Sequence, residues 1–379
     1  MGILRPCFLI GNGLRYAPHI VEILCQLQVP VLLTWQAADL VPESSDVYCG
    51  RPGAIGQRAA NIILQKSNWV MVAGARLDME TIGHNMESFA PNCHYPIVVD
   101  CDVNELRKFP ISWGRMLMDF NNPKTEYGTS GLPFVSGDPE WLAWCKALYT
   151  RFRPELDGTD GGDYVDPYAF MNALSDVCNE DDIIVPGSSG QQSCAFFQAF
   201  KVKRGQRILC CNTIGAMGFE PMAIGAAIAS GKRVIVVTGD GGFAQNMQEL
   251  EVVERLNLPI HYFIFSNGGY GSIASMQDGR FGQRVGSTPE SGFTVPDLEL
   301  IANAFNIPHR IMFDNKDLFK IKQDLREKRA TITEVKTSIN FKYACRVQST
   351  MVGNKLIPDR LEDMTPKLPA DELGRIMNA

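Results

Sequence analysis

The stretch RVIVVTGDGGFAQNMQELEVVERLNLPIHYFIFSNGG, residues 233–269, decides the expected fold. Its apolar runs at 233–238 and 260–265 predict two buried strands, and residues 243–256 between them predict a helix. Strand, helix and strand in this order form a βαβ unit with a right-handed crossover. The polar residues after the two strands should therefore meet at the carboxyl edge of a parallel sheet, where open α/β sheets bind ligands.

Two polar side chains stand at that edge. Asp240 follows the first strand within Gly239 to Gly242, and Asn267 follows the second strand before two glycines. Carboxylate, amide and carbonyl oxygens are the ligands that Mg²⁺ prefers, and glycine-rich backbone lets N–H groups approach a phosphate. Gly-Asp-Gly-Gly alone equally fits an ordinary turn. The paired Asn-Gly-Gly favours a magnesium–diphosphate site.

The rest of the chain repeats the alternation of strands and helices, which predicts an α/β fold class with two doubly wound parallel-sheet domains. The expected divisions are a Rossmann-like domain at 1–153, a linker at 154–165, a second domain at 166–345 and a tail at 346–379. We expect residues 109–129 to be irregular. The expected strands are 7–10, 30–34, 69–73, 97–100, 183–185 and 331–336, and the expected helices are 17–28, 59–65, 139–151, 166–177, 222–229 and 298–305.

Composition excludes several classes of protein. The chain has 379 residues and a formal net charge of -6, so a basic face for nucleic acid is not expected. No apolar run approaches the roughly 20 residues of a membrane span, and the N-terminus does not have the pattern of a signal peptide. The 11 cysteines include no C-x-x-C pair, which favours reduced thiols in a cytoplasmic protein.

The segments Gly239–Phe243, Gln248–Leu250, Asn257–Pro259 and Asn267-Gly268 resemble the signature of enzymes that use thiamine diphosphate (ThDP, also called thiamine pyrophosphate). Within them the chain is most similar to the acetolactate synthase branch. The resemblance implies ThDP and Mg²⁺ as cofactors, with Asp240, Asn267 and the carbonyl of Gly269 as metal ligands. The residues implied to contact the cofactor are Ser189, Gly190, Gln191, Gln192, Gly215, Met217, Gly239, Asp240, Gly241, Gly242, Asn267, Gly269, Tyr270 and Gly271.

Residues 212–226 resemble a second family segment, to which the catalytic roles belong. The resemblance implies that the Gly215 carbonyl accepts a hydrogen bond from the aminopyrimidine of the cofactor and that Met217 supports its bent shape. By itself Met217 would be better explained as core packing. Three positions depart from the family: Ser266 replaces an asparagine, Gln192 replaces a histidine, and Glu220 replaces a small residue.

The first half of the chain resembles the family's central domain. Arg76 and Asp78 stand where acetolactate synthases contact FAD, whereas other relatives lack FAD. The resemblance leaves FAD binding open and favours its absence.

Family members also have an N-terminal pyrimidine domain with a catalytic glutamate, and no segment here resembles it. The resemblance therefore implies the large subunit of a split enzyme, a homodimer of heterodimers with a separate pyrimidine-domain subunit. Its expected activity is decarboxylation of a small 2-oxo acid, pyruvate above all, with transfer of the resulting acyl unit to an acceptor carbonyl. The alternatives are a simple 2-oxo acid decarboxylase subunit and a non-catalytic, ThDP-binding regulatory subunit.

Overall fold

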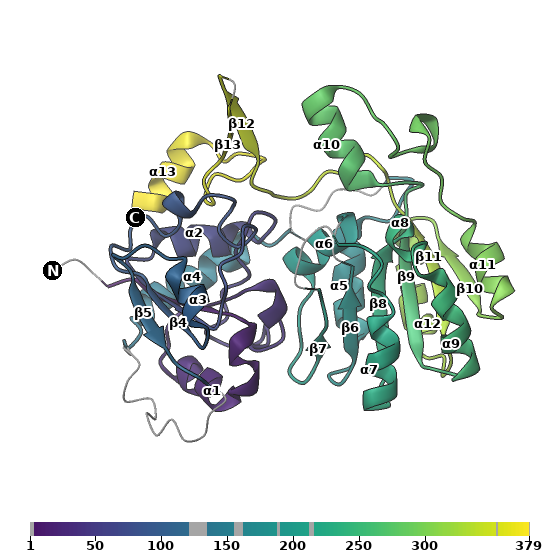
Figure 1. The fold of residues 1–379 in the computed structure, drawn as a ribbon, viewed down its shortest axis with the longest axis horizontal. Coiled ribbons are helices and arrows are strands. Elements are labelled where there is room, and N and C mark those ends of the chain that lie inside the picture. The colour runs from purple at the N-terminus through teal and green to yellow at the C-terminus, as the bar shows by residue number, and fades with distance from the viewer. Residues whose placement is uncertain are drawn as a thin grey trace. The chain divides into compact units, whose positions relative to one another are not determined.

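The computed structural model describes residues 4–120, 135–154, 162–187, 190–211, 216–353 and 355–378. The chain divides into two compact units, one of Met1–Pro154 with Ala344–Ala379 and one of Glu155–Tyr343. Each unit holds a parallel sheet covered by helices (Figure 1). The expected fold class, α/β with two parallel-sheet domains, is confirmed.

The sheet of the first unit has the strand order β2-β1-β3-β4-β5. Its strands are β1 (Pro6–Ile10), β2 (Val31–Leu33), β3 (Trp69–Ala73), β4 (Ile97–Asp100) and β5 (Gly114–Leu117), and its helices before the tail are α1 (Pro18–Gln26), α2 (Arg58–Lys66), α3 (Val103–Arg107) and α4 (Pro139–Arg151), with short 3₁₀ turns η1 (Asn12–Tyr16), η2 (Trp35–Ala37) and η3 (Met86–Ser88). The expectation of irregular structure at 109–129 is wrong for β5. Among the described strands this edge strand pairs only with β4, and Arg115 and Leu117 are exposed, so it has no continuous apolar run.

The last residues of the chain belong to the first unit. They form β12 (Ser349–Val352), β13 (Lys355–Pro358) and α13 (Ala370–Asn378). The guanidinium of Arg58 donates to the carbonyls of Met364 and Pro366, and Nζ of Lys66 donates to the carbonyls of Ile376 and Met377 at 3.0 Å each. These contacts bury both ends of α2, which explains how two charged side chains lie inside the unit. The segment expected as a tail at 346–379 is therefore grouped with the first unit.

The sheet of the second unit has the order β10-β11-β9-β8-β6-β7. Its strands are β6 (Ile183–Pro186), β7 (Arg207–Ile208), β8 (Val234–Gly239), β9 (Ile260–Ser266), β10 (His309–Met312) and β11 (Thr331–Lys336), and its helices are α5 (Pro167–Val177), α6 (Gln191–Ala199), α7 (Met222–Ser230), α8 (Asp240–Phe243), α9 (Leu250–Arg255), α10 (Gly271–Phe281), α11 (Leu298–Ala304) and α12 (Lys320–Asp324), with 3₁₀ turns η6 (Met247–Glu249), η7 (Pro289–Ser291) and η8 (Asn315–Phe319). Because β9, β8 and β6 are neighbours and parallel, the loops after them emerge side by side.

One helix differs from its prediction. The expected helix at 243–256 is split into α8, η6 and α9. The break falls at Asn246, whose side-chain amide donates to the carbonyl of Gly218. Asn246 itself lies outside helical geometry, with φ of -136° and ψ of 27°, and sequence periodicity does not reveal its contact with Gly218.

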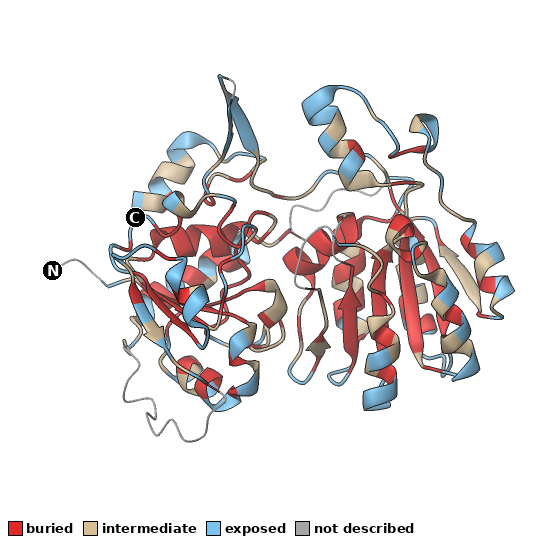
Figure 2. Cartoon of the chain, in the orientation of Figure 1, coloured by how far each residue is buried: buried red, intermediate tan, exposed pale blue. Residues whose placement is uncertain are grey.

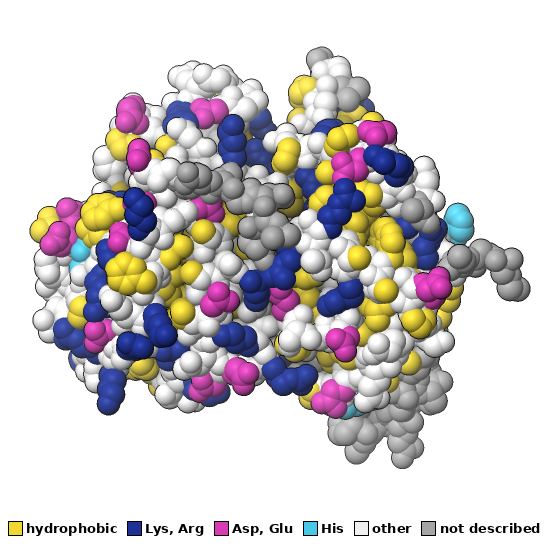
Figure 3. Space-filling view, turned by 180° about the vertical axis from the view of Figure 1, so that it is seen from behind, with side chains coloured by type: hydrophobic (Ala, Val, Ile, Leu, Met, Phe, Trp, Pro, Cys, Tyr) yellow, Lys and Arg dark blue, Asp and Glu magenta, His cyan; other side chains and the backbone are white. Residues whose placement is uncertain are grey.

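The core of the second unit surrounds β8 and β9, which are buried almost throughout (Figure 2). The ring of Phe170 on α5 packs edge-on against Phe263 and Phe265 of β9, with ring centroids 5.3 and 5.1 Å apart. Burial on both faces explains the near-continuous apolar strands of the quoted stretch. On the outside, basic and acidic side chains are interspersed over the face drawn in Figure 3, as the small net charge leads one to expect.

His261 of β9 gives this core a pH dependence. It is fully buried, its Nδ1 lies 2.9 Å from the hydroxyl of Thr331, and its Nε2 has no hydrogen-bond partner among the described residues. Burial lowers the pKa of His261 to about 4, and the charges of Arg233 and Arg310 act in the same direction. The unfolded chain takes up this proton below about pH 6.5, whereas the folded chain does not, so stability falls as the pH drops from there toward 4.

We expect this effect to lower the free energy of unfolding by about 2 kcal/mol between pH 6.5 and pH 5, at about 1.4 kcal/mol per pH unit. Urea denaturation of the wild type and of His261→Gln at both pH values isolates it, because all other titrating groups are shared. The variant should lose less stability than the wild type on acidification. Parallel losses in the two proteins would show that His261 is not kept neutral by the fold.

Candidate functional site

The loops after β6, β8 and β9 meet at the carboxyl edge of the second sheet. A Cβ atom placed on Gly239 would lie 3.4 Å from Nε2 of Gln192, which links the loops after β8 and β6. A Cβ atom placed on Gly271 would lie 3.0 Å from Nδ2 of Asn267 and 3.4 Å from Nε2 of Gln191, which links the loops after β9 and β6. Three loops that are far apart in sequence therefore form one site, at the end of the strands where α8 and α10 begin (Figure 1).

Asp240 lies at the centre of this arrangement and is 2% exposed. Its Oδ1 accepts a hydrogen bond from the N–H of Gly241 at 2.8 Å, and its Oδ2 accepts from the N–H groups of Asn267 and Gly268 at 3.0 and 2.8 Å. Burial raises the pKa of Asp240 to about 6, while the three N–H donors lower it. The structure thus brings together the two loops that carry the predicted metal ligands.

The donor set fits a magnesium ion. Oδ1 of Asp240 accepts one N–H bond and keeps a free lone pair, whereas Oδ2 already accepts two N–H bonds. Among the described residues, Oδ1 of Asn267 accepts only a 3.2 Å bond from the N–H of Gly269. Oε1 of Gln191 is a buried acceptor that has no hydrogen-bond partner within the described parts of the chain. No group of three His, Cys, Asp or Glu residues suited to a metal occurs among those residues. A divalent cation here would therefore be completed by amide, carbonyl, phosphate or water oxygens, as magnesium sites commonly are.

Two of the glycines are required by close packing. A Cβ atom on Gly241 would lie 2.5 Å from the ring of Tyr270, and a Cβ atom on Gly269 would collide with the carbonyl oxygen of Ser287. The Tyr270 ring is itself stacked on Phe293, with centroids 4.0 Å apart. A side chain at Gly241 would push the loops after β8 and β9 apart, and a side chain at Gly269 would push the second loop away from Ser287. The two glycines therefore let the backbone of these loops approach closely.

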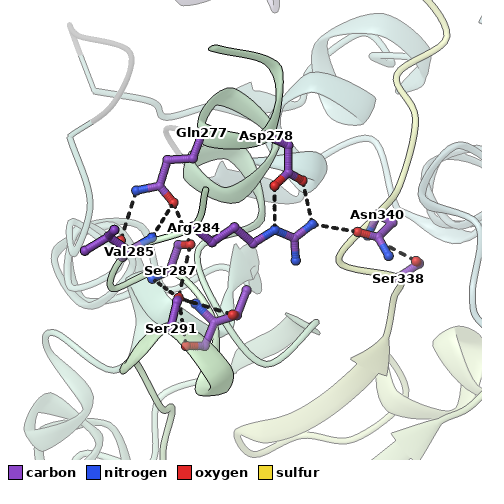
Figure 4. A network of polar contacts seen from close by, with 9 residues as sticks. Gln277, Asp278, Arg284, Val285, Ser287, Ser291, Ser338 and Asn340 are labelled. Carbon is purple, nitrogen blue, oxygen red and sulfur yellow. Dashed lines mark hydrogen bonds and ion pairs between the residues drawn. The ribbon is translucent and has the colours of Figure 1, made fainter. Parts of the chain in front are cut away.

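A polar network beyond α10 supports the loop after β9 (Figure 4). Arg284 donates to both carboxylate oxygens of Asp278, at 2.9 and 2.6 Å, and to Asn340 at 3.0 Å. The hydroxyl of Ser287 donates to Gln277 at 2.8 Å, and the carbonyl of Ser287 accepts the N–H of Tyr270 at 2.9 Å. The sequence does not predict these supporting residues, because their contacts join segments that are distant along the chain and form no local motif.

The remaining predicted site residues fall into two groups. Ser189 and Gly215 lie outside the described residues, so their predicted contacts stay predictions. Met217 is half-buried in the segment 216–221. That segment reaches the loop after β8, because Asn246 donates to the carbonyl of Gly218. Gly190 precedes α6 with φ of 91°, in a conformation that favours glycine.

Two family models match this chain. The model described as "Thiamine pyrophosphate enzyme, central domain" matches residues 4–113, and that described as "Thiamine pyrophosphate enzyme, C-terminal TPP binding domain" matches residues 188–335. The second match contains all three loops of the site. The chain has the central and C-terminal domains of a thiamine pyrophosphate enzyme. The expected family is thereby confirmed, and the second sheet is that of its TPP-binding domain.

The relatives of this thiamine pyrophosphate enzyme chain include acetolactate synthase large subunits. It is 29% identical to the acetolactate synthase isozyme 1 large subunit of Escherichia coli, over 72% of this chain and 48% of that protein. It is 26% identical to the probable acetolactate synthase large subunit of Methanocaldococcus jannaschii, over 98% of this chain and 64% of that protein. The chain thus spans about half to two thirds of the length of these relatives. Within its described part, no helix is long and apolar enough to cross a membrane.

Proposed function

We propose that this chain binds ThDP through its diphosphate, with Mg²⁺ held by Asp240, Asn267 and the carbonyl of Gly269. The observation that carries the proposal is the meeting of the Asp240 carboxylate with the backbone of Asn267 and Gly268. It supports the proposal because a buried carboxylate lies beside a residue with an amide oxygen and beside glycine-rich backbone. The match to a TPP-binding domain over the same loops supports the same assignment.

We further propose an acetolactate synthase-like reaction on a 2-oxo acid. The names of the relatives support this, because several are acetolactate synthase large subunits. When bound, ThDP supplies the electron sink for decarboxylation and acyl transfer. The chain's own residues would bind and orient it: Asp240 and Asn267 through the metal, Met217 beside the ring system, and the Gly215 carbonyl at the aminopyrimidine.

We propose that the first unit does not bind FAD. The side chain of Arg76 is 69% exposed and lies 3.5 Å from the carboxylate of Glu105, and Asp78 accepts a 2.9 Å bond from the N–H of Thr81. Both side chains therefore already have partners within their own unit, which favours a structure that does not depend on FAD.

We also propose that a second polypeptide supplies the pyrimidine domain and its catalytic glutamate, in a homodimer of heterodimers. The present chain matches the central and TPP-binding domains, and the proposal assigns the pyrimidine domain to a second chain. In that assembly the present chain fixes the diphosphate and the metal, and the partner protonates the aminopyrimidine.

The donor substrate is expected to be a small 2-oxo acid. Release of CO₂ from pyruvate, 2-oxobutyrate and benzoylformate, measured with the assembled enzyme, tests this expectation. Pyruvate should be turned over fastest, since the relatives named above are acetolactate synthases. Turnover restricted to sugar phosphates would contradict the proposal and indicate a ketol transfer without decarboxylation.

A further inference from the structure

Two hydrogen bonds join the segment 216–221 to residues close to the end of β8. Nδ2 of Asn246 donates to the carbonyl of Gly218, and the hydroxyl of Thr238 donates to Oε1 of Glu220. Gly218 has a φ of 79°, and a Cβ atom placed on it would lie 2.7 Å from Nδ2 of Asn246. We call these two hydrogen bonds the clamp. They join the segment that carries Met217 to Thr238 and Asn246, which precede and follow the stretch that carries Asp240.

The burial of the Glu220 carboxyl is unfavourable for the stability of the fold. It is 6% exposed, and its second oxygen, Oε2, has no hydrogen-bond partner in the part of the chain that the structure describes. Burial raises the pKa of the Glu220 carboxyl, opposed by the Thr238 hydroxyl and by the backbone. A buried carboxyl with one unsatisfied oxygen costs stability compared with an apolar side chain of similar size. Its presence here therefore points to a contribution other than stability.

The Glu220 carboxyl lies next to the Gly239–Gly242 loop. A Cβ atom placed on Gly242 would lie 3.2 Å from Oε1 of Glu220 and 3.4 Å from the hydroxyl of Thr238. Glu220 thus packs directly against the Gly239–Gly242 loop and lies three residues after Met217 in the sequence. A shift of Glu220 would move Met217 relative to the loop without removing any of the predicted metal ligands.

We propose that Glu220 is a positioning residue which, through the clamp, sets the place of Met217 relative to the diphosphate loop. Recognition of the organic part of the cofactor then depends on Glu220, whereas recognition of its magnesium–diphosphate part does not. This inference rests on the proposed binding of ThDP. It adds a determinant that lies outside the predicted metal ligands.

The affinities for ThDP and for inorganic diphosphate distinguish recognition of the organic part of the cofactor from recognition of its diphosphate. Calorimetric titration of the full chain with ThDP and with inorganic diphosphate, both in excess Mg²⁺, compares the whole cofactor with its anchor. For Glu220→Leu we expect on the order of tenfold weaker ThDP binding, the effect of one lost hydrogen bond to a charged group, and diphosphate affinity unchanged within about twofold. Glu220→Gln keeps an acceptor oxygen for Thr238 and should restore most of the ThDP affinity. Thr238→Val removes the donor while conserving volume and should reproduce the selective loss.

A matched control is Glu299→Leu, at an exposed position of α11. It should leave both affinities unchanged. Equal losses of ThDP and diphosphate binding in Glu220→Leu and Thr238→Val would overturn the inference, because the clamp would then serve the whole domain. Unchanged ThDP affinity in both would overturn it as well. A wild-type chain that binds neither ligand would contradict the proposed function itself, whereas wild-type binding of both leaves only the role of Glu220 in question.

Discussion

Asp240→Ala is expected to reduce the affinity for ThDP in the presence of Mg²⁺ by on the order of 10²–10⁴-fold. The wild-type carboxylate is buried and accepts three backbone N–H groups from two loops. Its removal takes away the anionic metal ligand and leaves those N–H groups without their acceptor. Loss of one partner of a buried charged interaction costs about 3–5 kcal/mol, which gives the stated range.

Calorimetric titration of ThDP at saturating Mg²⁺ measures this effect, with any partner protein present in equal amount. Asn267→Ala should weaken binding less, by roughly tenfold or somewhat more, because its ligand oxygen is uncharged. Glu299→Ala, which removes an exposed carboxylate on α11, is the control and should bind as the wild type does. Thermal unfolding of each variant separates a lost site from a lost fold. Unchanged ThDP affinity in a folded Asp240→Ala protein would refute the site.

The second large effect concerns assembly. With ThDP and Mg²⁺ bound, this 379-residue chain alone should exchange the C2 proton of the cofactor on the order of 10²–10⁴-fold more slowly than the complete enzyme, which is the usual value of general acid–base assistance. The reason is that the glutamate acting on the aminopyrimidine is proposed to come from a second polypeptide. Among the described residues, the acids near the site include Asp240, assigned to the metal, Glu220, which contacts Thr238, and Glu334, which is paired with Lys336.

Hydrogen–deuterium exchange at C2, followed by NMR after acid quench, gives this rate directly. Adding the pyrimidine-domain polypeptide should raise the rate, and adding the same polypeptide with its glutamate changed to glutamine should not. Fast exchange in the purified chain with no second protein would show that the chain holds a complete active site. Slow exchange that no partner accelerates would favour a non-catalytic, ThDP-binding role.

Much of the fold could be predicted because its signals are local. Strand β3 and helix α4 have the bounds that the sequence predicts, since each is a run with its own apolar pattern or cap. Asp166 caps α5 as expected and accepts the N–H groups of Tyr168 and Ala169. Helix α6 was missed because all its residues are buried, so no polar face marks its period.

The site also combines contacts that the sequence predicts with contacts that it does not predict. The proximity of Asp240 and Asn267 follows from one βαβ unit, whose crossover brings both strand ends to one edge. The contacts of Gly269 with Ser287 and of Glu220 with Thr238 depend on how a loop returns to the sheet. The spacing of residues in the sequence does not predict such long-range contacts. For the same reason it did not predict that residues 344–379 pack into the first unit.

The central claim is that Asp240 and Asn267 hold a metal that anchors ThDP. A crystal structure of the chain with ThDP and Mn²⁺ in place of Mg²⁺ tests it most directly, because manganese gives an anomalous signal. We expect one anomalous peak about 2–2.3 Å from an Asp240 carboxylate oxygen, Oδ1 of Asn267 and the carbonyl of Gly269, with the diphosphate beside it. A peak that lies away from Asp240 and Asn267, or a diphosphate bound elsewhere without metal, would show that these two residues do not hold the metal.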